Sequence, residues 1–289
     1  LVLAVVTTMT MFTGCGGAGS TSASTKSITI QGGNTEGDLD PAGVALGMFI
    51  QYSRLCLEPL ITYDSDGKVS KAMAESYEES SDGLTWTFHL RKDAKWSDGS
   101  AVTSADFVNT IKRSLDGKTS KSIYADMLSP IVGATEAYAG TASVDNVGVT
   151  APDDYTIEFK LVKPCSYFLK LIAMQCCYPS KAGIATNENE TWYTDPKTNL
   201  ANGAFYMTEY VQGQYYKLKK NPNYYDADKV YLEDITVKFI DDATAAVSAY
   251  KTNEVDFATN LPAYVMSEYQ GKSDLVLQPN ITTRFILFN

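Results

Sequence analysis

Apolar and polar positions follow two different periods along this chain. Leu84, Trp86, Phe88 and Leu90 occupy every second position, which predicts a β-strand with one buried face. Residues 103–115 have helical spacing instead and begin with Thr and Ser, which are favoured helix caps. Strands and helices mixed in this way predict α/β or α+β layers. Further strands are expected near residues 27–30, 60–63, 147–150, 155–161, 205–210, 215–219, 235–240, 255–258, 275–277 and 284–288, and further helices near residues 48–57, 124–128, 167–174, 243–252 and from Pro262 onward.

Composition narrows the possible functions. With 289 residues the chain is long enough for about two domains. Its 34 acidic and 24 basic residues give a net charge of −10, which argues against a nucleic-acid partner. The single histidine, His89, falls on the polar face of its strand and disfavours Ser-His or Cys-His catalysis. We therefore predict no catalytic residue, no metal site and no cofactor.

The first 25 residues carry no charged side chain. Residues 1–14 resemble part of a secretory signal, too short to span a bilayer, and Cys15 follows small residues as in a bacterial lipobox. Residues 15–26 are rich in Gly, Ser and Thr and are expected to form a flexible tether. The resemblance implies a lipid on Cys15; the alternative is a buried N-terminal strand with a chance cysteine. Both ends of the chain look cut, so a fragment of a longer protein is expected.

Four cysteines remain after Cys15: Cys56, Cys165, Cys176 and Cys177. The adjacent Cys176 and Cys177 cannot easily bond each other, because a disulfide needs a specific geometry. A bond from Cys165 to either one stays open in an exported protein. The spacing lacks paired Cys-x-x-Cys units, so buried free thiols are favoured over a zinc site.

Residues 86–108 carry the most specific pattern of the chain. An aromatic strand ending in Leu90-Arg91 is followed by the turn Trp96-Ser97-Asp98-Gly99 and by Thr-Ser-Ala-Asp-Phe at residues 103–107. This order resembles the signature of the extracellular solute-binding proteins of family 5, the peptide-binding components of ABC importers. Three further blocks resemble the family in the same order: residues 37–41, 202–225 and 250–256. The chain departs from the family at Tyr225, where Trp is usual, and at Asn253, where Gly is usual.

The resemblance implies an α/β, two-lobed fold like the type II periplasmic binding proteins, with an inserted α+β subdomain. Residues 27–57 and 186–289 are then parts of the first lobe, with the start of the second lobe at the end. Residues 58–185 form the inserted subdomain, and most of the second lobe is missing from this chain.

The resemblance also implies a function without bond making or breaking. The receptor closes two lobes around an extended peptide and presents it to the membrane permease. It would be a monomer held by its lipid on the outer side of the cytoplasmic membrane, or periplasmic where an outer membrane exists. The implied ligand-binding residues are Val44, Ala45, Leu46, Gly47, Tyr124 and Asn260. Each also has a purely structural interpretation: residues 44–47 as the start of a helix, Tyr124 as a core aromatic and Asn260 as a helix cap.

Other functions stay open at this stage. The same fold could bind a dipeptide, glutathione, haem, a nickel complex or an oligosaccharide. A secreted hydrolase using paired carboxylates such as Asp153-Asp154 is a second class, and a surface adhesin or signalling receptor is a third. The pair Asp153-Asp154 is better explained as part of a turn, and a second pair, Asp241-Asp242, as the N-terminus of a helix, where negative charge is favourable.

Overall fold

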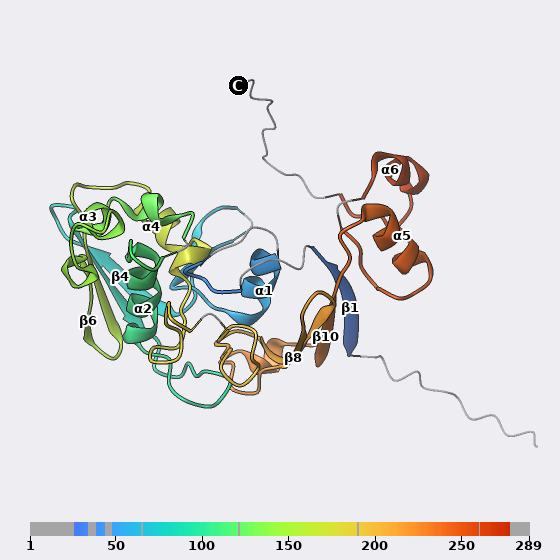
Figure 1. The fold of residues 1–289 in the computed structure, drawn as a ribbon, viewed down its shortest axis with the longest axis horizontal. Helices are drawn as coiled ribbons and strands as arrows, with labels where there is room; N and C mark the ends of the chain where they lie inside the picture. Colours follow the sequence, from blue (N-terminus) through green and yellow to red (C-terminus); the bar gives the residue numbers. More distant parts are fainter. Residues whose placement is uncertain are drawn as a thin grey trace, which may run out of the picture.

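The computed structural model describes residues 26–33, 39–43, 48–64, 66–120, 122–189, 191–259 and 261–277, with only the backbone at residues 48–50. The described chain forms two regions side by side, each built on its own four-stranded sheet (Figure 1). No helix in this described part is both long and apolar enough to cross a membrane.

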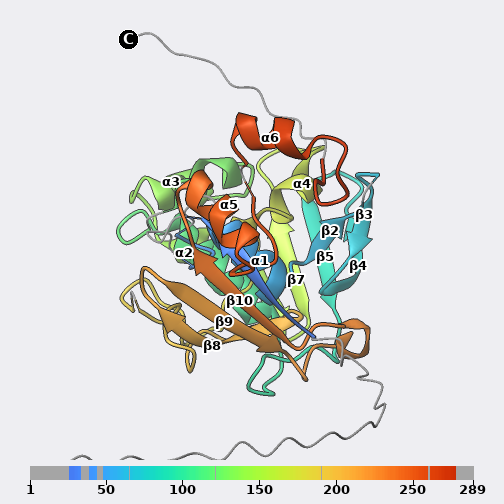
Figure 2. The ribbon, with the colours of Figure 1, turned by 90° about the vertical axis from the view of Figure 1, so that its right-hand side faces the viewer.

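The first region is built on a mixed sheet that joins the start of the described chain to its later part. In this sheet β1 pairs in parallel with β10, while β10 with β9 and β9 with β8 are antiparallel. Figure 2 shows these strands lying next to one another, with two helices near one end. We call it sheet A. In sheet order its strands are β1 (Ser27–Gly32), β10 (Asp234–Phe239), β9 (Tyr215–Lys220) and β8 (Phe205–Val211).

Sheet A has helices on both sides. The helix α1 (Met48–Cys56) lies between the two regions, and α5 (Ala243–Lys251) and α6 (Ala263–Tyr269) lie on the other side (Figure 1). Tyr52 of α1 packs edge to face against Tyr216 of β9 with ring centroids 5.9 Å apart, and Cys56 and Leu218 belong to the same cluster. We call this the small core. Its buried members are Leu39, Tyr52, Cys56, Ala201, Phe205, Met207, Tyr216, Leu218, Ile235 and Val237.

The second region contains sheet C and a two-stranded hairpin. All neighbouring strands of sheet C are antiparallel. In sheet order they are β4 (Ala74–Glu79), β5 (Thr85–Leu90), β7 (Thr156–Lys160) and β6 (Val149–Asp153), and the hairpin is β2 (Ile61–Tyr63) with β3 (Val69–Lys71). The helices are α2 (Ser104–Leu115), α3 (Ala134–Tyr138), α4 (Phe168–Ile172) and the 3-10 helices η1 (Ala125–Leu128), η2 (Val144–Asn146) and η3 (Gln175–Cys177), with η4 (Ala227–Lys229) between β9 and β10.

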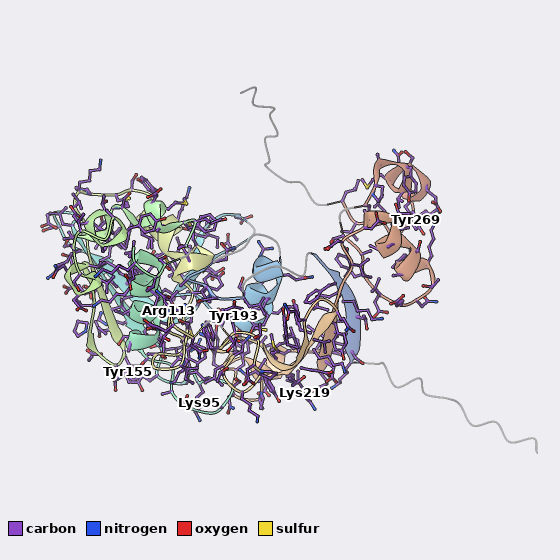
Figure 3. All side chains as sticks on the ribbon, viewed as in Figure 1. Lys95, Arg113, Tyr155, Tyr193, Lys219 and Tyr269 are labelled. Atoms are coloured by element: carbon purple, nitrogen blue, oxygen red, sulfur yellow. The ribbon has the colours of Figure 1, made fainter. Side chains whose placement is uncertain are left out.

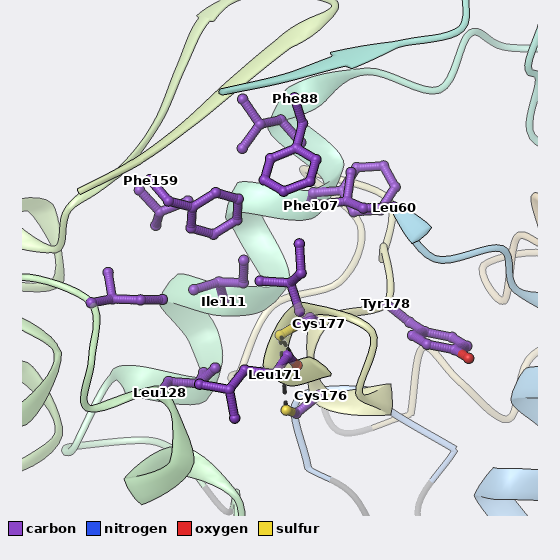
Figure 4. Packing of buried hydrophobic residues seen from close by; sticks show 14 of the residues in the cluster. Leu60, Phe88, Phe107, Ile111, Leu128, Phe159, Leu171, Cys176, Cys177 and Tyr178 are labelled. Carbon is purple, nitrogen blue, oxygen red and sulfur yellow. Dashed lines mark hydrogen bonds between the residues drawn. The ribbon is translucent and has the colours of Figure 1, made fainter. Parts of the chain in front are cut away.

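The large core lies between sheet C and its helices. Phe88 of β5 and Phe159 of β7 meet edge to face with ring centroids 5.7 Å apart, and both are fully buried. Phe107 and Ile111 of α2 complete this packing (Figure 4). Aromatic pairs in this arrangement contribute stability beyond the area that they bury.

Two predicted elements are confirmed in detail. In β5 buried and half-buried residues alternate, so Trp86, Phe88 and Leu90 face the core and His89 does not. His89 instead lies 3.1 Å from Glu78, with its side chain 44% exposed. The helix α2 begins after Thr103, where a capping box joins Thr103 and Asp106.

Two predicted strands are wrong. Residues 255–258 form only an isolated parallel bridge, between Ile30 and Phe257. Residues 275–277 have no regular structure, and Val276 and Leu277 are 77% and 68% exposed. Alternating or apolar residues predict a strand only where a partner strand can pair with them, and no other described strand borders residues 275–277. The strand expected at residues 284–288 lies outside the described residues.

The four cysteines of the described chain are free and buried. The Sγ atoms of Cys176 and Cys177 are 4.0 Å apart inside the large core (Figure 4). The interpretation of these residues as small buried thiols is therefore confirmed, and no bond joins Cys165 to either one.

Candidate functional site

The parallel strands of sheet A end at the same edge. After β1 the chain leads to α1 on one side of the sheet, and after β10 it leads to α5 on the other (Figure 1). Open α/β sheets bind ligands outside the carboxyl ends of the strands, where the connections diverge in this way. We call this place the carboxyl edge and define it by Gln31, Gly32, Ile240, Phe257 and Thr259.

Gln31 organises the carboxyl edge. Its side chain is buried, its Nε2 donates to the carbonyl of Ile240 at 2.8 Å, and its Oε1 accepts from the backbone N–H and the hydroxyl of Thr259 at 2.8 and 3.0 Å. Its backbone N–H donates to the carbonyl of Phe257 at 2.9 Å, and its own carbonyl accepts from Gln51 of α1 at 3.4 Å. A buried polar residue needs such partners, and here they come from three separate segments, at residues 51, 240 and 257–259.

A pocket of about 490 Å³ opens beside the carboxyl edge. Its walls are mainly apolar, and Val247 and Val265 are buried in it, while Phe257 and Leu277 are exposed. Its volume lies within the range of small-ligand pockets. The complete lining is Val247, Tyr250, Asp256, Phe257, Ala258, Thr259, Leu261, Val265, Met266, Tyr269, Asp274, Leu275, Val276 and Leu277.

Three polar side chains of this pocket, Tyr250, Asp256 and Asp274, form hydrogen bonds within the chain. Asp256 accepts the backbone N–H of Thr29 at 2.7 Å. The hydroxyl of Tyr250 donates to Asp274 at 3.3 Å, and the charge of Asp274 raises the pKa of Tyr250. The pocket can therefore take up an apolar group but shows no activated nucleophile. Within the described residues, no cluster of three or more His, Cys, Asp or Glu side chains could hold a metal ion.

A turn at residues 40–43 follows β1 and comes before α1. Asp40 shapes it, because one carboxylate oxygen accepts the N–H of Ala42 at 2.9 Å and its carbonyl accepts the N–H of Gly43 at 3.1 Å. The other carboxylate oxygen forms an ion pair with Arg113 of α2. Burial raises the pKa of Asp40, and the positive charge of Arg113 opposes that shift.

Several neighbouring side chains fix the guanidinium of Arg113. Its Nη1 donates to Ser180 Oγ at 3.3 Å, its Nε donates to Asn187 Oδ1 at 3.2 Å, and its guanidinium lies 5.6 Å from the ring centroid of Trp192. Figure 3 labels Arg113 at α2, in the second region. The ion pair thus joins the turn of residues 40–43 to the second region.

The predicted ligand-binding residues are only partly described. Cys15, Val44, Ala45, Leu46, Gly47 and Asn260 lie outside the described residues. Their described neighbours nevertheless meet at Gln31: Thr259 comes directly before Asn260, and Gln51 lies in the first turn of α1, just after Gly47. Tyr124 lies elsewhere, half-buried against the large core at the start of η1, and its place in a ligand pocket stays a prediction.

Two blocks of the resemblance, residues 86–108 and 202–225, meet where the two regions join, whereas Tyr250 and Asp256 of the block 250–256 line the pocket beside the carboxyl edge. The side chain of Asn202 accepts the N–H of Glu58 at 2.9 Å and donates to its carbonyl at 3.1 Å, while Gly203 N–H donates to the Cys56 carbonyl at 2.9 Å. Asn221 donates to the carbonyl of Gly203 at 2.9 Å. We call this meeting place the seam and define it by residues 56–58, 96–98, 201–203 and 221–225.

Two more motifs meet at the seam. Asn223 donates to the carbonyl of Ser97 at 3.1 Å, which joins the Asn-Pro-Asn-Tyr-Tyr block to the Trp-Ser-Asp-Gly turn. The hydroxyls of Tyr224 and Tyr225 donate to Glu58 at 2.6 and 3.2 Å. These motifs therefore build the scaffold, and their presence does not by itself locate a ligand.

A mixed sheet whose parallel strands end at a switch point, with a pocket beside it, is the arrangement in which open α/β proteins bind small ligands. Comparison with known proteins gives the family. A model of the bacterial extracellular solute-binding proteins, family 5, matches residues 68–289, and the chain belongs to this family.

Known relatives agree in sequence and in structure. The periplasmic oligopeptide-binding protein OppA of Escherichia coli K12 is 34% identical over 245 residues, which are 84% of this chain and 45% of that protein. The structure of the E. coli murein tripeptide binding protein MppA matches with a TM-score of 0.80 and 29% identity, and Listeria monocytogenes OppA bound to peptide with 0.78 and 27%. These matches cover 87% of this chain and 49% and 50% of those structures. The chain thus spans about half the length of the relatives it matches.

Another relative has a different named ligand. The probable deoxycholate-binding periplasmic protein YgiS of E. coli K12 is 31% identical over 88% of this chain and 48% of that protein. The family is therefore established as one of solute-binding proteins, and the solute needs its own test.

Proposed function

We propose that this chain is part of the receptor of a peptide ABC importer, which captures extracellular oligopeptides and delivers them to the membrane permease. The observation that carries the proposal is the junction at Gln31. It joins the residues next to both predicted ligand-binding segments at the carboxyl edge of sheet A. The peptide-binding names of several relatives support the choice of ligand.

The proposed mechanism is capture by enclosure. An extended peptide pairs its backbone with the backbone of the receptor, for which we propose the segment of Val44 to Gly47, so affinity depends little on side-chain identity. A second lobe then closes over the ligand by a hinge motion, and the closed form is the one presented to the permease. No bond is made or broken in any step.

We further propose that residues 27–57 and 186–289 belong to the first lobe and residues 58–185 to an inserted subdomain. The division of buried residues supports this. The small core draws on residues 39–56 and 201–237, whereas all buried members of the large core except Leu57 and Leu200 lie within residues 58–185.

We also propose that Cys15 carries a lipid that holds the receptor at the outer side of the cytoplasmic membrane. Expression of the full-length protein with a labelled fatty acid tests this. Label in the wild type and its loss in Cys15→Ser are expected; equal labelling of both proteins contradicts the proposal.

Calorimetry of the full-length protein tests the choice of ligand. We expect saturable binding of mixed peptides of two to six residues and none of deoxycholate. The reverse result would replace the peptide with an amphipathic solute. The variant Gln31→Ala should weaken peptide binding at least tenfold, about 1.4 kcal/mol, whereas Gln214→Ala, on an exposed turn of sheet A, should not change it.

A further inference from the structure

The predicted ligand-binding segment of Val44 to Gly47 begins directly after the turn of residues 40–43. This turn is short and strongly constrained, since Pro41 restricts its backbone and Asp40 accepts the N–H of Ala42. The backbone of residues 40–43 therefore depends on where Asp40 is held.

A side chain of the second region holds Asp40 in place. Its carboxylate pairs with Arg113, which α2 carries on the helix face that also bears Asp106 and Thr110. Both members of the pair are more than 90% buried, so water screens their interaction weakly. The contact joins a turn beside sheet A to a helix of the large core.

The guanidinium has little freedom to move. Ser180, Asn187 and Asp40 each accept from a different nitrogen of Arg113, and these three partners come from separate parts of the chain. Ser180 is further joined to Thr110 of the same helix at 2.7 Å between hydroxyl oxygens. An arginine fixed in this way presents a charge at a defined point, which a flexible lysine would not do.

We propose that Arg113 is a positioning residue for ligand binding: through Asp40 it fixes the turn from which the ligand-binding segment starts. The inserted subdomain then contributes to affinity without touching the ligand. This inference rests on the proposed function, since it assumes that the segment after Gly43 meets the solute.

The direct test is hydrogen exchange on the full-length protein without ligand. In Arg113→Met, the amides of Asp40, Ala42 and Gly43 and of the segment that follows should exchange at least tenfold faster, while those of β9 keep their rate. The matched control is Arg91→Met, which removes another arginine near the seam, one that pairs with Asp93 at 2.6 Å and does not touch the turn. Equal exchange in wild type and Arg113→Met overturns the proposal whether or not the protein binds peptides.

The second test separates positioning from stability. Asp40→Asn keeps an oxygen that can accept the Ala42 N–H but leaves Arg113 as a buried charge without its carboxylate, so its midpoint of thermal unfolding should fall. The double variant Asp40→Asn with Arg113→Met removes that charge and should recover part of the midpoint. Its peptide affinity should nevertheless stay at least tenfold below wild type, whereas Arg91→Met should stay within twofold.

Three results decide whether Arg113 positions the turn or acts on stability alone. Affinity that recovers together with the unfolding midpoint means that Arg113 acts on stability alone, and the proposal is wrong. Affinity that stays low while the midpoint recovers supports positioning. If even the wild type binds no peptide, the proposed function fails, and the exchange experiment still decides whether Arg113 fixes the turn.

Discussion

The two regions of this chain bury very different amounts of apolar surface. Among the described residues, 32 buried apolar side chains form the large core and ten form the small core. Small cores supply little net stability. The carboxyl edge nevertheless lies on the region with the small core. The candidate binding edge is thus carried by the weaker region, and the stronger region supports it through the seam and through Arg113.

The kinds of contact differ as well. The large core is held by aromatic packing, such as the Phe159 and Phe168 rings with centroids 5.3 Å apart. The junctions at the seam and at Arg113 are polar and directional, as in the paired hydrogen bonds between Asn202 and Glu58. Packing tolerates small changes in shape, whereas directional contacts fix one arrangement. The predictions below test this contrast, beginning with the largest effect.

Removing a large side chain from either core should destabilise the fold, but the two cores should unfold in different ways. Phe107→Ala, in the large core, should lower the free energy of unfolding by about 3–5 kcal/mol and destabilise both regions together. Leu218→Ala, in the small core, should cost about 2–5 kcal/mol and unfold sheet A before sheet C. Urea titrations followed by tryptophan fluorescence and by hydrogen exchange of β9 measure this. A single coincident transition for Leu218→Ala would mean that the two regions unfold together as one unit.

The seam should tolerate no added methyl group at Gly203. A Cβ there would come within 2.7 Å of the Cys56 carbonyl carbon and 2.9 Å of its oxygen, both backbone atoms. Gly203→Ala should therefore lower the free energy of unfolding by about 1–3 kcal/mol. Gly33→Ala is the matched control, because no atom lies within 4 Å of its added Cβ, and it should change stability by less than about 0.5 kcal/mol. Equal urea midpoints for the two variants would show that the seam can shift.

Local elements could be predicted from the sequence because their causes are local. The strand β5 follows from strict alternation, and α2 follows from the capping residue Thr103 and an apolar stripe. The strands expected at residues 255–258 and 275–277 failed because pairing depends on a neighbour that a short segment cannot specify. The family motifs were found by their order in the chain, but their role at the seam became visible only in three dimensions.

The candidate site was harder to predict for the same reason. Gln31 is one polar residue near the end of a strand in which polar and apolar residues alternate, and its partners Gln51, Ile240 and Thr259 are distant in sequence. Arg113 gave a weak signal as a charge near the apolar stripe of α2, but its partner Asp40 lies 73 residues away. The parallel pairing of β1 with β10 brings Ile240 next to Gln31, and the bridge between Ile30 and Phe257 brings Thr259 there.

Asn202 should be the most important single side chain of the seam. It satisfies both the N–H and the carbonyl of Glu58. Asn202→Ala leaves these partly buried groups without those partners and should cost about 1–3 kcal/mol. Asn189→Ala, at an exposed position in the connection between the two regions, is the control and should cost less than about 0.5 kcal/mol. Thermal unfolding of the two variants gives the comparison, and a loss in Asn202→Ala no larger than that in the control would contradict it.

Glu58 should give the seam a pH dependence that the large core lacks. Burial raises the pKa of Glu58, and the hydrogen bonds from Tyr224 and Tyr225 only partly offset this. A carboxyl with a higher pKa in the folded than in the unfolded chain binds its proton more tightly when folded. Its contribution to the free energy of unfolding is therefore fully present below the unfolded pKa, about 4.3, and is lost as pH rises through the raised value.

Glu58→Gln removes this titration and keeps an oxygen that can accept from Tyr224. The free energy of unfolding of wild type minus that of Glu58→Gln should thus fall as pH rises from 4 to 7, as measured by urea titrations at several pH values. Tyr224→Phe sharpens the test, since it removes a hydrogen bond that lowers the pKa of Glu58. The decline should be larger in that background. Parallel pH profiles for wild type and Glu58→Gln would mean that Glu58 is as well solvated as an exposed carboxylate, and that the seam is wetter than the cores on either side of it.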